Sequence, residues 1–171
     1  MRGPVVLLCL SVLVCARVAA QQPAAPDSAK RDSAPLPLSP VQEKYLHGLK
    51  SVGRGVAQLK TGVDRLSRAQ ASGDTPRQRQ AATLLGGFCG SARSFLASGR
   101  AQMQPTAYED STRIKAQWLT AQVDTLIQFM PTCEAQAAKT PATLAVDLVA
   151  RLRNYDAALK DFRGAVGLPT R

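Results

Sequence analysis

The residues that could perform chemistry are few and scattered. His47 is the only histidine, so a multi-histidine metal site is excluded, and a histidine-based triad would need partners that the sequence does not offer. The Glu-x-x-His pair of di-iron bundles, the C-x-x-C-H haem attachment sequence and the G-x-S-x-G nucleophile motif are all absent. We therefore expect a protein that is not an enzyme and that has no metal or cofactor.

The cysteines suggest a different kind of chemistry, an exported disulfide. Residues 1–20 have the positive start, short apolar run and small-residue end of a secretory signal peptide. Cleavage after Ala20 removes two of the four cysteines and leaves Cys89 and Cys133. In a periplasmic or extracellular compartment, which is oxidising, this pair is a disulfide candidate.

Simple helix geometry argues against that disulfide. If the turn between the second and third helices is centred near residue 105, the two cysteines differ in distance from it by about 12 residues, or roughly 18 Å of rise. A disulfide needs Cα atoms within about 7 Å. The bond could form if the glycines at 86–90 bend the second helix, or if the segment after Pro131 folds back. The sequence leaves open whether the pair is bonded or remains as two separate thiols.

The excess of basic residues is the one feature of the sequence that points to a kind of binding partner. The chain has 22 Lys and Arg against 12 Asp and Glu, a net charge of +10, and loss of residues 1–20 with their two arginines leaves +8. Arg65, Arg68, Arg77 and Arg79 flank the turn between the first two predicted helices and would give the bundle a basic end. An anionic lipid head group, an envelope polymer or an acidic protein would suit such an end. Nucleic acid is not expected, since no aromatic residues interleave the charges, and the alternative is an ordinary solvated surface.

Four predicted helices position these residues. Apolar residues alternate steps of four and three along the first helix, which is the seven-residue repeat of a helix that buries one narrow seam. They are Tyr45, Leu49, Val52, Val56, Leu59, Val63 and Leu66. Similar patterns predict helices at about 40–72, 76–103, 106–130 and 141–163, and no segment has the period of a strand. We predict an all-α, up-down-up-down four-helix bundle; the alternative is a two-helix coiled coil that dimerises.

Capping sequences mark the helix ends. Ser39 to Gln42 forms a capping box, and Thr75 and Thr106 are expected to cap the next two helices in the same way. Gly73 is expected to stop the first helix in a left-handed conformation. Pro131 is expected to end the third helix.

The domain boundaries follow from these signals. Residues 1–20 are the predicted signal peptide, residues 21–38 form a Pro/Ala/Ser-rich linker expected to be disordered, and residues 39–168 form the bundle. After residue 20, no stretch is apolar and long enough to span a membrane.

Three glycines flank the apolar seam of the first helix. Gly48, Gly55 and Gly62 are seven residues apart, and three interior glycines cost about 3 kcal/mol of helix propensity. We expect a neighbouring helix to lie unusually close to this edge. If the edge were open to solvent, it would be a surface for a partner or for self-association.

The sequence favours an exported, non-enzymatic helical bundle that works as a binding module, with an anionic envelope surface or an acidic protein as candidate partners. Two alternatives belong to other classes. One is a carrier that holds a small ligand or cofactor in the bundle interior, and the other is a self-associating structural component of the envelope.

Overall fold

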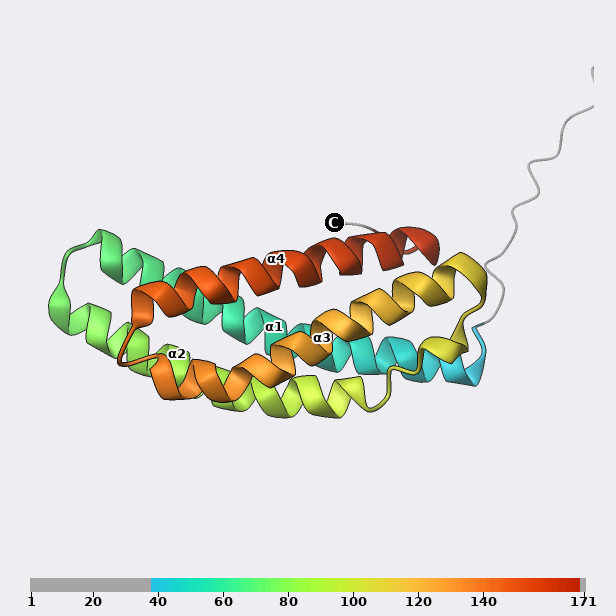
Figure 1. Cartoon of the computed structure of the whole chain (residues 1–171), viewed down its shortest axis with the longest axis horizontal. Coiled ribbons are helices and arrows are strands. Elements are labelled where there is room, and N and C mark those ends of the chain that lie inside the picture. Colours follow the sequence, from blue (N-terminus) through green and yellow to red (C-terminus); the bar gives the residue numbers. More distant parts are fainter. Residues whose placement is uncertain (1–37, 170–171) are drawn as a thin grey trace, which may run out of the picture. The chain divides into compact units, whose positions relative to one another are not determined.

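The computed structural model describes residues 38–169. The predicted signal peptide and all but the last residue of the predicted linker lie outside the described residues. The described part contains four long helices, a short 3₁₀ helix (η1) and no strand; the elements are α1 Pro40–Ala71, α2 Thr75–Arg100, η1 Pro105–Ala107, α3 Asp110–Gln136 and α4 Pro141–Ala165 (Figure 1). The predicted all-α class is confirmed.

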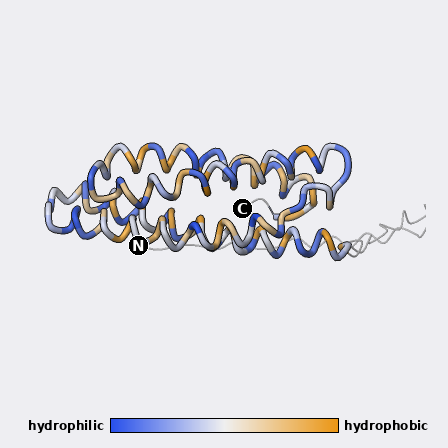
Figure 2. Tube along the Cα trace, turned by 60° about the horizontal axis from the view of Figure 1, so that its bottom comes forward, coloured by the Kyte–Doolittle hydropathy of each residue, from blue (hydrophilic) through white to orange (hydrophobic). Residues whose placement is uncertain are grey.

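The four helices lie lengthwise beside one another, and each reverses the direction of the one before it (Figure 1). Helices α1 and α2 pack most extensively, α3 packs against α2 and α4, and the contact between α1 and α4 is the smallest between neighbouring long helices. Hydrophobic residues recur along every helix (Figure 2). One chain thus forms the predicted up-down-up-down bundle, and the coiled coil that needs a second copy is not the arrangement found.

The seam of α1 is the centre of the core. All seven residues of the predicted stripe are buried: Tyr45, Leu49, Val52, Val56, Leu59, Val63 and Leu66. Helix α4 buries a matching stripe that includes Leu148, Leu152, Tyr155 and Phe162. The seven-residue period therefore identified the inward faces of both helices.

Both ends of α1 and the start of α2 follow the sequence signals, with one change. The Ser39 side chain accepts from the Gln42 backbone N–H, and the Gln42 side chain accepts from the Ser39 N–H, so the predicted capping box is present. Gly73 has the expected positive φ, 69°. The cap of α2 is Asp74 rather than Thr75, because the Asp74 carboxylate accepts from the Arg77 N–H at 3.1 Å.

Helix α3 begins later than predicted because Tyr108 packs into the core in an extended conformation. Tyr108 is buried in an extended conformation, with its ring 5.2 Å from the rings of both Tyr45 and Phe162. This contact takes Tyr108 out of any helix, so the predicted cap at Thr106 is wrong. Residues 105–107 form η1 instead, and α3 starts at Asp110.

Helix α3 also ends later than predicted, because Pro131 lies inside it and α3 runs on to Gln136. Pro131 is exposed, whereas Cys133 and Ala137 just beyond it are buried. A proline removes one helical hydrogen bond and crowds the preceding turn, at about 3 kcal/mol. Burial of the following turn against α2 offsets that cost, so the prediction that Pro131 ends the helix is wrong.

A disulfide joins Cys89 of α2 to Cys133 of α3, with Cα atoms 5.9 Å apart and both residues fully buried. The geometric objection failed because the connection is not a tight turn. It is centred near residue 105, as assumed, but it runs lengthwise beyond the end of α2 through η1 before α3 begins (Figure 1), so the two helices are offset and the two cysteines lie at the same level. Gly86 faces Ala137 one turn away, so the helices also touch there.

The glycine edge of α1 lies against α2. A Cβ built on Gly48 would lie 2.5 Å from the carbonyl oxygen of Gly99, one on Gly55 would lie 3.1 Å from that of Ala92, and one on Gly62 would lie 2.8 Å from a methyl carbon of Leu85. The expected close neighbour is therefore α2 of the same chain. The three glycines are buried, so they offer no surface to a partner.

Gly48→Ala is expected to destabilise the bundle, because the new methyl group meets rigid backbone. Overpacking typically costs about 1–3 kcal/mol, and we expect this to outweigh the gain of about 1 kcal/mol in helix propensity. Gly53→Ala is the matched control in the same helix, since its Cβ would meet nothing within 4 Å, and it should stabilise by about 0.5–1 kcal/mol. Urea unfolding measures both, and equal effects would contradict the close approach of α2.

Removal of the disulfide is expected to lower the free energy of unfolding by about 4 kcal/mol in the chain-entropy estimate, given a separation of 44 residues. Unfolding of the oxidised chain is compared with unfolding of the reduced chain and of the Cys89→Ala/Cys133→Ala variant. A reduced chain that is as stable as the oxidised one would contradict this bond.

Candidate functional site

A surface pocket of about 500 Å³ opens where α1 turns into α2. Gly73 reverses the chain there, so the last turns of α1 lie beside the first turns of α2. The lining residues are Arg65, Arg68, Ala69, Ser72, Arg77, Gln80, Ala81 and Leu84. Three of the four arginines expected at a basic end thus share one pocket, and Arg79 is not among its lining residues.

The three guanidinium groups of this basic pocket differ in their partners. Arg77 is ion-paired with Asp74, with Nε 3.1 Å from Oδ2. Arg68 donates from Nε to the backbone oxygen of Asp64 at 3.2 Å, and Arg65 lies over the Phe88 ring, 5.8 Å from its centroid. Within residues 38–169, neither Arg65 nor Arg68 forms a salt bridge, so both keep donors for a carboxylate or phosphate.

The remaining wall of the basic pocket is partly polar and partly apolar. Ser72 and Gln80 supply its polar part. Ala69 and Ala81 are buried, and Leu84 is 40% exposed. A site that combines cationic groups with an exposed leucine suits an anionic group carried by an organic molecule.

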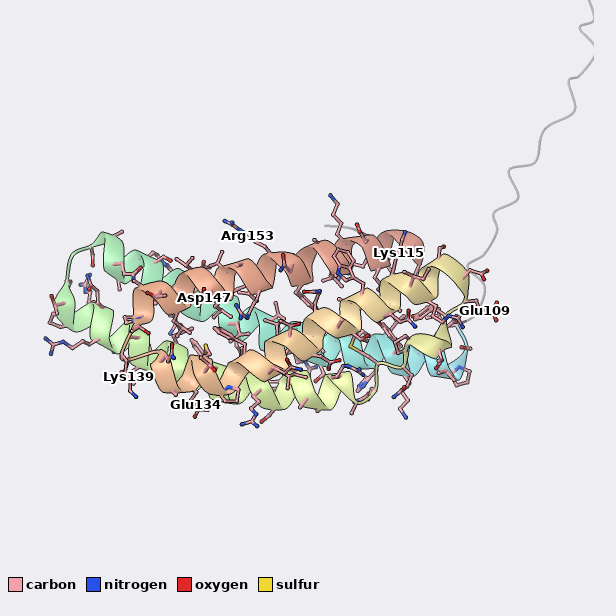
Figure 3. The ribbon with its side chains drawn as sticks, in the orientation of Figure 1. Glu109, Lys115, Glu134, Lys139, Asp147 and Arg153 are labelled. Atoms are coloured by element: carbon pink, nitrogen blue, oxygen red, sulfur yellow. A yellow bond between two sulfur atoms is a disulfide. The ribbon has the colours of Figure 1, made fainter. Side chains whose placement is uncertain are left out.

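The other polar candidates stay apart. His47 is exposed, with Nδ1 2.8 Å from the side-chain oxygen of Gln102. Figure 3 shows Glu109, Glu134 and Asp147 spread over separate parts of the bundle. Across the described residues, no group of three or more His, Cys, Asp or Glu side chains is placed to hold a metal ion.

A second pocket, of about 370 Å³, lies between α1 and α4 and was not expected from the sequence. Its apolar lining consists of Leu46, Leu49, Gly53, Tyr155, Leu159 and Leu168, and its charged residues are Lys50 and Arg163. One signal was available: Gly53 stands outside the seven-residue glycine series. Nothing lies within 4 Å of a Cβ built on it.

No protein-family model matches the chain, and no curated protein or solved structure matches it either. None of the described helices is long and apolar enough to cross a membrane.

The three tyrosines should lose their phenol protons at a higher pH than free tyrosine does. Burial raises the pKa of Tyr108 and of Tyr155 to about 12. The pKa of Tyr45 is raised further, mainly by burial and in smaller part by the neighbouring Tyr108. The unfolded chain, with ordinary pKa values near 10, loses these protons first. Stability from these groups is therefore complete below pH ~10 and falls as pH rises towards 12. Phenolate absorbance followed with and without denaturant measures this, and identical titrations would contradict burial of the tyrosines.

Proposed function

We propose that this chain is an exported, non-enzymatic binding module that uses the basic pocket to hold an anionic group of an envelope surface. The observation that carries the proposal is the arrangement of Arg65, Arg68 and Arg77 around one pocket, two of them without a salt bridge in the described part. The signal-peptide pattern of residues 1–20 supports export. The disulfide supports an oxidising compartment.

The guanidinium group suits this role. It is planar, stays charged at all physiological pH values and presents several donors, so it binds phosphate and carboxylate oxygens in pairs. Arg65 has the face of Phe88 beneath it, which limits its conformations before any anion arrives. The excess of basic residues outside the signal peptide adds a long-range attraction to a negative surface.

A phosphate-bearing lipid surface fits the pocket best among anionic partners. A volume of about 500 Å³ falls within the range of roughly 300–1,000 Å³ for small-molecule sites, enough for a head group. Leu84, 40% exposed at the same pocket, offers contact to the apolar part of such a lipid. Binding of this kind depends on charge and weakens as salt screens it.

The double variant Arg65→Gln/Arg68→Gln is expected to bind vesicles of phosphatidylglycerol and phosphatidylcholine about 10- to 30-fold more weakly. Each basic residue near an anionic surface contributes about 1 kcal/mol. Vesicle co-sedimentation at low and at physiological ionic strength measures the affinity, which should fall with salt.

Arg113→Gln/Lys115→Gln is the matched control. It removes the same charge from the first turns of α3, at the opposite end of the bundle from the α1–α2 turn (Figures 1 and 3). This control should retain most of the binding. Equal losses in the two double variants would reduce the effect to net charge, and no binding by the unsubstituted chain would reject the proposal.

A further inference from the structure

The α1–α4 pocket is an apolar space that the chain leaves unfilled. Gly53 supplies no side chain on the α1 side, and a Cβ there would meet nothing within 4 Å. Leu159 of α4 is only partly buried, although it belongs to the apolar stripe of that helix. Glycine on one wall and a half-buried leucine on the other leave room for an apolar guest.

The C-terminal end of α4 supplies part of the wall. Gly167 has a positive φ of 69°, and the N–H of Leu168 donates to the carbonyl oxygen of Arg163 at 2.9 Å. This is the bond of a Schellman motif, which reverses the chain after a helix. The reversal brings Leu168 to the pocket, so the backbone conformation that ends α4 also helps to enclose the space.

The charged residues that line this pocket are all positive. Lys50 and Arg163 are its charged residues, and no Asp or Glu is among its lining residues. Tyr155 lines it as well; its phenol is neutral at physiological pH, as any tyrosine is, and burial raises its pKa further, to about 12. The neighbouring pocket along the same two helices differs, since its lining includes two carboxylates, Asp64 and Asp156.

We propose that the α1–α4 pocket binds a single-chain aliphatic carboxylic acid. The hydrocarbon chain lies against the leucines beside Gly53, and the carboxylate lies against Lys50 and Arg163. The volume of about 370 Å³ is at the lower end of the range of roughly 300–1,000 Å³ for small-molecule sites, which favours a medium-length chain. This proposal does not depend on the basic pocket and assigns the molecule a second, separate ligand.

Decanoate below its micelle concentration is the probe, titrated into the full disulfide-bonded chain by calorimetry. The unsubstituted chain should bind it at one saturable site. Gly53→Leu should weaken binding at least tenfold, because the new side chain occupies the space. The variant should still fold, since its Cβ meets no atom and leucine is a better helix former than glycine; circular dichroism checks this.

Gly87→Leu is the matched control on α2. Gly87 is helical and exposed, and a Cβ on it meets nothing within 4 Å, but it does not line the pocket. This variant should bind decanoate as the unsubstituted chain does. Unchanged binding by Gly53→Leu, or no saturable binding by the unsubstituted chain, would overturn the proposal.

The charge assignment has its own test. Lys50→Gln should weaken decanoate binding severalfold, whereas Lys115→Gln, which removes a lysine elsewhere on the surface, should not. Decanol should bind more weakly than decanoate, and equal affinities would overturn the assignment of an acid. Arg65→Gln/Arg68→Gln should leave decanoate binding unchanged, so that failure at this pocket is distinguishable from failure of the proposed lipid-surface binding.

Discussion

The close approach of α1 and α2 along Gly48, Gly55 and Gly62 is the constraint on which the rest of the structure depends. Contact between backbones fixes these two helices in register over most of their length, and their last and first turns then meet at the basic pocket. Helix α1 packs far more closely against α2 than against α4. The space beside Gly53 lies on the less closely packed α4 side, and the basic pocket lies where α1 meets α2.

Much of this fold could be predicted because its information is local. The spacing of apolar residues identified the buried face of α1, and the capping box at Ser39 and the left-handed Gly73 marked both of its ends. The start and end of α3 were predicted wrongly because distant contacts decide them. Tyr108 leaves the helix to reach Tyr45 and Phe162, and the turn after Pro131 stays helical where Cys133 is buried against α2.

The two pockets also differ in whether local sequence or distant contacts bring their residues together. Arg65, Arg68 and Arg77 flank one short turn, so their proximity could be predicted from sequence distance alone. Arg79 is near in sequence but does not line the pocket, which depends on the direction of each side chain around the helix. The α1–α4 pocket joins residues such as Gly53 and Leu168, whose proximity follows only from the packing of the first and last helices.

The disulfide has a consequence for how the bundle opens. Helix α2 is held to α1 by backbone contact and to α3 by the Cys89–Cys133 bond and the Arg100–Asp124 ion pair. Within residues 38–169, no disulfide reaches α4. It packs against α3, where Arg151 lies over the Phe129 ring, and is tied to α1 by Lys60–Asp156, an exposed pair worth little. Local unfolding begins where tertiary restraints are weakest. We therefore expect the contact between α1 and α4 to open before the contact between α1 and α2, which uncovers the apolar space beside Gly53 while the first three helices stay joined.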